Sequence, residues 1–340
     1  MATMKDVADL AGVSTTTVSH LLNGTRYVSP NLAERVLEAI KELKYRPYGV
    51  ARSLRRKESR MIATVIPDNT NPYFAEIARR LEDSCFDAGY NVIVCNSDGS
   101  PQKELRYLEL LLDKGVDGIV FVATGRDPDS IEMLREQRLP LVVVDRDVEF
   151  IGGDTVLIDN TYGGRIATEH LLDHGHRRLG CISGPCGLRP SMRRVSGFLS
   201  AANEYGINVP DDSIVAGDFT SASGYEALLE LLSRDNPPTG VFVCNDMMAV
   251  GAICAAQELG YTIPHDLSLV GYDGIELTRY TSPPLTTVEQ PFQRLADRTI
   301  ELLLSRIADP EHEPKREVLQ PRLIERSSCI DYEPARSSSA

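Results

Sequence analysis

Short apolar runs alternate with helical stretches from residue 61 onwards, and this alternation most restricts how the chain can fold. The runs are rich in Val and Ile and too short for buried helices, so they predict buried strands. A strand–helix–strand series predicts a parallel sheet covered by helices. The first strands are expected at Met61–Pro67, Val92–Cys95, Gly118–Val122 and Leu141–Val144, with helices at Pro72–Ala88, Pro101–Lys114 and Pro128–Gln137 between them.

A second series follows, and its first unit echoes the first: Ala88-Gly-Tyr-Asn-Val matches Glu204-Tyr-Gly-Ile-Asn-Val. Two similar series predict two doubly wound parallel sheets, one in each lobe of a hinged α/β core at 61–326. The helix Phe292–Ala308 is expected to return to the first lobe. Lobe 1 is therefore expected at about 61–160 plus 292–320, and lobe 2 at about 161–291 plus 321–332. The strands of the second series are expected at Leu179–Ile182, Ile214–Gly217, Gly240–Val243 and Leu267–Val270.

Residues 1–46 carry the pattern of an all-α helix-turn-helix headpiece. Thr3 and Asp6 have the spacing of a capping box for a helix that ends near Ala11, and Gly12 supplies a residue tolerant of positive φ in the turn. Ser14 caps a second helix that ends near Leu22. A third helix begins at Ser29-Pro30, buries Leu32, Val36, Ile40 and Leu43 at helical spacing, and ends before Pro47.

The second helix is expected to expose short polar side chains that can reach base edges in the major groove of DNA. The alternative is a three-helix bundle with a polar surface helix. Charge favours DNA binding, because residues 1–60 carry a net charge of +5. The rest of the chain carries a net charge of −18, so the total is −13. The DNA-binding candidates on the headpiece are Thr15, Thr16, Thr17, Ser19, His20 and Asn23.

Residues 47–60 join the headpiece to the core and are expected to form a hinge helix only when a partner subunit and DNA hold it. Leu54 is an apolar residue among cations, suited to insertion between base pairs in a minor groove, and Arg52, Arg55 and Arg56 can contact phosphates.

These segments resemble the lactose/galactose-repressor family, and within it the purine and ribose repressors. The resemblance rests on Lys5-Asp-Val-Ala, Gly12-Val-Ser-Thr-Thr-Thr-Val-Ser-His and Val50-Ala-Arg-Ser-Leu, and it extends to about Arg326. It implies a homodimer that binds a palindromic operator, with Thr15, Thr16 and His20 on bases and Leu54 at a central step. Gly49 replaces the alanine expected in such a hinge helix, which weakens that helix.

Ligands of open α/β sheets bind beyond the carboxyl ends of the strands, and polar and aromatic residues gather at those places in this chain. Carboxylates accept from sugar hydroxyls, Arg and Asn donate, and aromatic faces cover the C–H side of a sugar ring. Two Arg and two Asp balance in charge, which favours a neutral ligand. Some of the polar residues could instead cap helices. The candidates are Asn71, Tyr73, Phe74, Asp145, Arg146, Arg194, Phe219, Asn245, Asp273 and Gln290.

These ten positions are similar to the sugar contacts of periplasmic ribose-binding proteins. The pair Asp145-Arg146 departs from the Asp-Trp pair of the purine repressor, which favours ribose or a related sugar over a purine. We expect a repressor released from operator DNA by ribose as inducer. The alternative is a purine-responsive repressor with hypoxanthine or guanine as corepressor, and the sequence does not fix the sign of the switch.

Two other classes of protein are disfavoured. No Walker loop, Gly-x-Ser-x-Gly elbow or His-Glu-x-x-His motif indicates an enzyme, and no catalytic residue or cofactor is expected. An exported sugar-binding protein would lack the headpiece and carry a signal peptide, so a cytoplasmic protein without a membrane segment is expected.

Cysteine and histidine are assigned structural roles. The seven cysteines are expected to be reduced core residues rather than a disulfide or metal framework. His170, His174 and His176 stand where a helix is expected to end, and no metal site is expected there. The tail 333–340 is polar and Ser-rich, so it is expected to be disordered and to join no dimers into tetramers.

Overall fold

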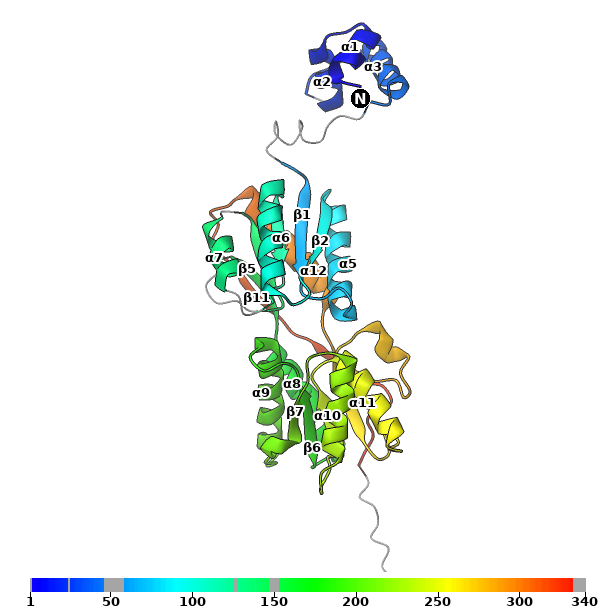
Figure 1. The fold of residues 1–340 in the computed structure, drawn as a ribbon, viewed down its shortest axis with the longest axis vertical. Coiled ribbons are helices and arrows are strands. Elements are labelled where there is room, and N and C mark those ends of the chain that lie inside the picture. Colours follow the sequence, from blue (N-terminus) through cyan, green and yellow to red (C-terminus); the bar gives the residue numbers. More distant parts are fainter. Residues whose placement is uncertain are drawn as a thin grey trace, which may run out of the picture. The chain divides into compact units, whose positions relative to one another are not determined.

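The computed structural model describes residues 2–23, 25–45, 58–124, 128–137, 139–146 and 153–332. It divides into two compact units, Met1–Ser59 and Arg60–Ala340, drawn in Figure 1. The hinge candidates Arg52, Leu54 and Arg55, the hinge-helix prediction around Gly49 and the predicted disorder of 333–340 lie outside the described residues. So does the side chain of Asn23, although its backbone belongs to a helix.

The first unit is a three-helix headpiece of α1 (Met4–Ala11), α2 (Thr15–Asn23) and α3 (Pro30–Glu42). The capping box is present, because the Thr3 side chain accepts from the Asp6 amide while Asp6 accepts from the Thr3 amide. Gly12 ends α1 at φ +63°, in the left-handed region that glycine tolerates. A core of Val7, Ala8, Ala11, Val18, Val36, Ala39 and Tyr45 holds the helices together. The helix-turn-helix prediction is confirmed.

The first sheet of the second unit has the strand order β11-β5-β4-β3-β1-β2, and all its neighbours are parallel. Helices α5 (Pro72–Asp87) and α12 (Phe292–Ala308) pack on one face, and α6 (Pro101–Lys114) and α7 (Pro128–Glu136) pack on the other. The strands are β1 (Met61–Ile66), β2 (Asn91–Asn96), β3 (Gly118–Phe121), β4 (Leu141–Val144), β5 (Asp154–Ile158) and β11 (Arg316–Leu319). This sheet with its helices is called lobe 1 below.

The second sheet, which forms lobe 2, has the order β12-β10-β9-β8-β6-β7 and is parallel except for the edge pair β10–β12. Its strands are β6 (Leu179–Ser183), β7 (Ile214–Ala216), β8 (Gly240–Val243), β9 (Ser268–Asp273), β10 (Thr286–Glu289) and β12 (Arg322–Ile324). Its helices are α8 (Asn160–Asp173), α9 (Arg189–Glu204), α10 (Ser221–Leu232) and α11 (Asp246–Glu258), and short 3-10 turns lie at Asp211–Ser213 and Glu276–Arg279.

The chain passes between the lobes three times, after β5, after β10 and after β11, as Figure 1 shows. The second passage leads into α12, whose residues pack in the core of lobe 1. Four strands were not predicted: β5, β10, β11 and β12. They are three to five residues long and carry polar residues, so they lack the apolar runs by which the other strands were recognised.

Helices α8 and α9 pack through glycine. A Cβ on Gly164 would lie 2.0 Å from the backbone oxygen of Arg194, and one on Gly197 would lie 2.1 Å from that of Thr161. We expect Gly164→Ala to force the helices apart and to lower the free energy of unfolding of the core by about 1–3 kcal/mol. Urea unfolding of the full chain measures this loss. A value within 0.5 kcal/mol of wild type, roughly the range of neutral surface changes, would contradict this packing.

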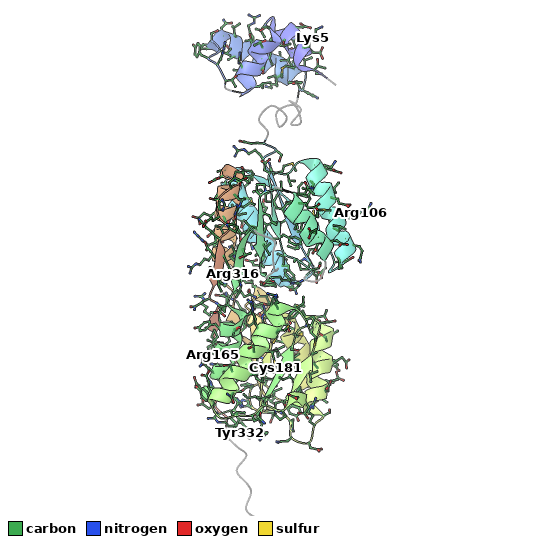
Figure 2. The ribbon with its side chains drawn as sticks, turned by 90° about the vertical axis from the view of Figure 1, so that its left-hand side faces the viewer. Lys5, Arg106, Arg165, Cys181, Arg316 and Tyr332 are labelled. Atoms are coloured by element: carbon green, nitrogen blue, oxygen red, sulfur yellow. The ribbon has the colours of Figure 1, made fainter. Side chains whose placement is uncertain are left out.

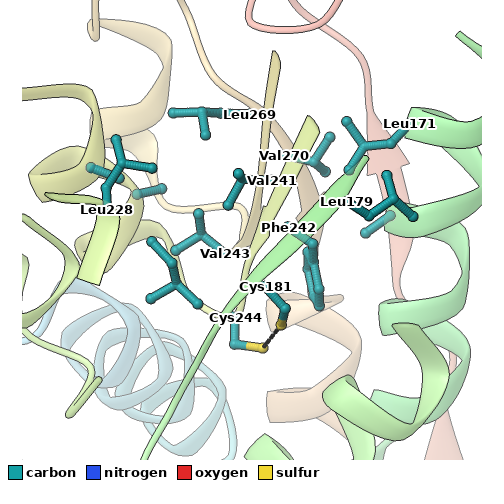
Figure 3. Close-up of a cluster of buried hydrophobic side chains, with 14 of the residues drawn as sticks. Leu171, Leu179, Cys181, Leu228, Val241, Phe242, Val243, Cys244, Leu269 and Val270 are labelled. Atoms are coloured by element: carbon teal, nitrogen blue, oxygen red, sulfur yellow. Dashed lines mark hydrogen bonds between the residues drawn. The ribbon is translucent and has the colours of Figure 1, made fainter. Parts of the chain in front are cut away.

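The seven cysteines all lie in the described part of the chain, where none forms a disulfide, and five of them are buried. Cys181 and Cys244 lie in the core of lobe 2 with their Sγ atoms 3.9 Å apart, as Figure 3 shows. Cys186 and Cys254 are exposed, so the prediction that every cysteine belongs to the core is wrong for these two. No helix in the described part of the chain combines the length and apolarity that a bilayer-spanning helix needs.

Candidate functional site

A pocket lies between the two lobes, at the carboxyl ends of the strands of both sheets. Its empty volume is about 340 Å³ when the open solvent at its mouth is included. It contains nine of the ten residues expected there from the sequence. Leu188 and Pro190, at the start of α9, also line it. They were not predicted, because only polar and aromatic residues beyond the strand ends were expected to contact a ligand. The lining residues are Asn71, Tyr73, Phe74, Asp145, Arg146, Leu188, Pro190, Arg194, Phe219, Asn245 and Asp273.

Two asparagines cap the helices that begin at the pocket. Asn71 accepts from the Tyr73 amide at the start of α5, and Asn245 accepts from the Met248 amide at the start of α11. Capping was the alternative role considered for such residues, and here it coexists with a place in the pocket. The Asn245 amide also donates to the Phe219 carbonyl oxygen at 3.1 Å. Capping occupies each side-chain oxygen and leaves amide N–H groups that can donate to a ligand.

The tenth residue, Gln290, lies behind the pocket wall and connects the lobes. Its side-chain nitrogen donates to Asp273 at 2.8 Å, while its oxygen lies 2.9 Å from the Tyr73 hydroxyl. The same hydroxyl lies 2.5 Å from Asp145. A phenol carries one proton and can satisfy only one of these acceptors at a time. Burial raises the pKa of Tyr73, which keeps that proton in place. The network therefore has more acceptors than donors.

Arg194 is a buried donor held by contacts on several sides. Its Nε donates to Asn160 at 2.7 Å and its Nη1 to the Cys244 carbonyl oxygen at 2.5 Å, and Nη1 lies 3.4 Å from Asp273. The guanidinium stacks 3.7 Å from the centroid of the Tyr272 ring. Burial raises the pKa of Asp273, and the charge of Arg194 opposes that rise.

Arg146 lies across the pocket on lobe 1. Its Nη1 donates to the carbonyl oxygens of Ala123 at 2.9 Å and Thr124 at 3.1 Å, and its guanidinium lies over Phe74. Its Nε lies 4.0 Å from Asp145. Burial lowers the pKa of Arg146. Two carboxylates and two guanidinium groups thus meet in one small pocket with no net charge.

The backbone is strained around the same pocket. Asp145, Phe219 and Asp273 all have positive φ, at +64°, +72° and +117°. Side-chain-bearing residues rarely adopt this conformation, and it concentrates at binding sites where the surrounding fold enforces it. The Phe219 ring also requires Gly184 behind it, since a Cβ there would lie 2.2 Å from two ring atoms. No pattern in the sequence pointed to Gly184.

The headpiece presents part of the predicted DNA-binding surface. Thr15 and Thr16 are exposed at the start of α2, whereas Ser19 and His20 are half-buried, so the prediction that they are exposed is wrong. His20 Nδ1 pairs with the Thr25 hydroxyl at 2.7 Å, which fixes the imidazole. The half-buried Thr17 hydroxyl pairs with Ser14. Arg35, which was not predicted, donates to the Ala11 carbonyl oxygen and holds the turn before α2.

Comparisons with known proteins agree with both halves of this description. Residues 3–48 match the model of bacterial regulatory proteins of the lacI family, and residues 168–329 match a periplasmic binding protein-like domain. The chain is 42% identical over 331 residues to the ribose operon repressor of Escherichia coli K12, covering 97% of this chain and all of that one. It is 40% identical over 332 residues to the transcriptional repressor PurR of Photobacterium profundum, covering 97% and 99% of the two chains.

Solved structures resemble the fold. One is a LacI family transcriptional regulator from Enterococcus faecium with bound ribose, at 34% identity and a TM-score of 0.73 over 80% of this chain and all of that one. Another is the Lac repressor dimer bound to operator and the anti-inducer ONPF, at 26% identity and a TM-score of 0.87 over 97% and 99% of the two chains.

Proposed function

The chain belongs to the lacI family of bacterial regulatory proteins and is a DNA-binding transcriptional repressor, and from this premise we propose that ribose, or a closely related sugar, controls its affinity for operator DNA. In this proposal residues 1–46 bind the operator, 47–60 transmit the signal, and 61–326 bind the sugar and form a homodimer. DNA binding of this kind would take place in the cytoplasm.

The observation that carries the choice of a sugar is the set of charged groups in the pocket. Asp145 and Asp273 accept from hydroxyls, Arg146 and Arg194 donate, and the shared proton of Tyr73 leaves an acceptor that a ligand hydroxyl can satisfy. Phe74 and Phe219 offer apolar faces to the ring. Relatives and a solved structure that carry ribose in their names support the same choice.

A purine corepressor is the second candidate. The PurR relatives are as similar to this chain as the ribose operon repressor, and the aromatic rings of Tyr73, Phe74 and Phe219 could stack on a purine. Arg146, next to Asp145, weighs against a purine. Its guanidinium can donate to the hydroxyl groups of a sugar, whereas a purine ring stacked between aromatic side chains would leave it no face to cover.

The proposed mechanism couples the pocket to the operator through the hinge. Ribose contacts both lobes and changes their angle, which moves the two hinge segments of the dimer, so that Leu54 leaves the central step of the operator and Arg52 and Arg55 lose phosphates. Thr15, Thr16, Thr17, Ser19, His20 and Asn23 are the proposed contacts of α2 with bases and phosphates. A shift from 1:99 to 99:1 requires about 5.5 kcal/mol of difference in sugar affinity between the two states.

Operator binding tests the proposal. The full chain would select its operator from random duplex DNA, and fluorescence anisotropy would then measure affinity at fixed salt with ribose or hypoxanthine added. Ribose is expected to weaken binding by at least about tenfold, while hypoxanthine leaves it unchanged. Tighter binding with hypoxanthine and no effect of ribose would establish the purine alternative instead.

Gly184→Ala is expected to weaken ribose binding by roughly tenfold, equal to about 1.4 kcal/mol, because the added methyl displaces the Phe219 ring. Isothermal titration of the full chain measures the dissociation constant, and melting of the ligand-free protein controls for damage to the fold. An unchanged dissociation constant would mean that Phe219 does not contact the sugar.

A further inference from the structure

A second cluster of side chains lies at the end of α8, where that helix meets the last described segment of the chain. His170 stands in the last turn of α8 and His174 caps the helix, so the i, i+4 spacing brings both rings to one face. Cys329 joins them from the C-terminal segment. One potential metal-binding atom from each residue lies within 4.8 Å of the other two. The cluster is far from the pocket along α8, whose first residue, Asn160, contacts Arg194.

His170 provides the clearest sign that this cluster lacks a partner. The residue is only 8% exposed, and within the described residues its Nε2 atom has no hydrogen-bond partner. A buried polar atom without a partner is costly and rare in folded proteins.

His174 is already oriented as a ligand. Its Nδ1 lies 2.8 Å from the carbonyl oxygen of His170. A carbonyl can only accept, so Nδ1 carries the proton and Nε2 carries the free lone pair. Metal-binding histidines commonly donate their other ring nitrogen to a backbone carbonyl in this way. His176 differs, because both of its ring nitrogens have partners. Its Nδ1 contacts the Thr239 hydroxyl, and its Nε2 contacts the Ile330 carbonyl oxygen.

Cys329 adds a buried sulfur. It is 7% exposed, and binding of a metal ion must replace the proton of its thiol.

We propose that His170, His174 and Cys329 bind a transition-metal ion, with Zn²⁺ as the best fit. Two imidazole nitrogens and one thiolate are a donor set that Zn²⁺ favours. Bonds of about 2.0–2.3 Å place ligand atoms roughly 3–4 Å apart, so the cluster must contract by about 1 Å. A water molecule completes the tetrahedron. The site departs from the purely structural roles that the sequence suggested for these residues.

A metal ion bound here would link the segment around Cys329 to helix α8 of lobe 2. The Tyr332 amide donates to the His174 carbonyl oxygen, and Ser328 bonds to Leu269 and Thr286 of β9 and β10. Figure 2 shows Tyr332 at the end of lobe 2 remote from lobe 1. Zn²⁺ therefore stabilises this end of lobe 2 without touching the ribose pocket.

Zinc titration of the full-length protein tests the proposal. Protein stripped with a chelator would be titrated with Zn²⁺ against a chromophoric competitor, and one ion per chain is expected. Cys329→Ser and His174→Gln are each expected to weaken binding by at least about tenfold. The matched controls Cys254→Ser and His265→Gln change exposed residues outside the cluster and should bind as wild type does.

The absorption spectrum of bound Co²⁺ distinguishes metal binding by these residues from a purely structural role. Bound through Cys329, it should give a sulfur-to-cobalt charge-transfer band in wild type and in His174→Gln at higher Co²⁺, and none in Cys329→Ser. His174→Gln, at a half-buried position, keeps the test valid if Cys329→Ser fails to fold. Wild-type affinity in the folded cluster variants, or wild-type protein without the band, would overturn the proposal.

Discussion

Arg194→Met is expected to lower the free energy of unfolding of the core by about 3–5 kcal/mol and to abolish ribose binding. The substitution removes the charge beside Asp273, which is 3% exposed, together with the donors to Asn160 and the Cys244 carbonyl oxygen. A buried carboxylate without its counter-charge is costly because the protein interior solvates it poorly. Urea unfolding of the ligand-free chain gives the stability, and isothermal titration gives the affinity.

Two further variants separate charge from packing. Arg165→Met, on the exposed side of α8, removes ion pairs with Glu169 and Glu204 and should cost much less. Arg194→Met combined with Asp273→Asn removes the lone charge and should recover part of the lost stability, and Asn suits the positive φ at that position. A double variant no more stable than the single one would show that the pair does not interact as described.

Arg146→Met is expected to weaken ribose binding by at least about 30-fold, because the loss of one partner from a buried, charged hydrogen bond typically lowers affinity by this much. The bonds to Ala123 and Thr124 occupy Nη1 and hold the guanidinium in place, so Nη2 can donate to a sugar hydroxyl without further ordering. The variant should stay on operator DNA at ribose concentrations that release wild type.

Arg79→Met is the matched control, because Arg79 also belongs to lobe 1 but is exposed and pairs weakly with Glu76. Calorimetry with both variants measures the difference. If Arg146→Met bound ribose as wild type does, Arg146 would not contact the ligand and the case against a purine would lose its main support.

Local chemistry explains which elements could be predicted from the sequence. Prolines mark the first residue of several helices, so α5 and α6 were predicted to within a residue of their observed bounds. Helix α12, which begins at Phe292 directly after Pro291, was predicted equally well. Buried strands such as β4 and β8 are continuous apolar runs. The strands β10 and β11 were missed because polar residues interrupt such runs: Thr286 and Thr287 in β10, and Arg316 and Glu317 in β11. Each of these strands is formed by pairing with its neighbour in the sheet, which local sequence does not show.

The pocket was predictable for a related reason. The carboxyl ends of parallel strands meet at one edge of a sheet, so the sequence could place Asn245 and Asp273 together in lobe 2 and Asp145 at the corresponding edge of lobe 1. Gly184 and the bridging position of Gln290 depend on contacts between segments distant in sequence. The pairing of His170 and His174 with Cys329, more than 150 residues away, has the same origin.

Thermal melting of the full chain with ribose, hypoxanthine and guanine, all at the same concentration, tests the central claim most directly. A ligand that binds the folded state and is present at about 100 times its dissociation constant should add about 2.7 kcal/mol, which appears as a rise of a few degrees in the melting temperature. Ribose is predicted to raise the melting temperature and the purines to leave it unchanged. A rise with either purine and none with ribose would contradict the assignment of the pocket to a sugar.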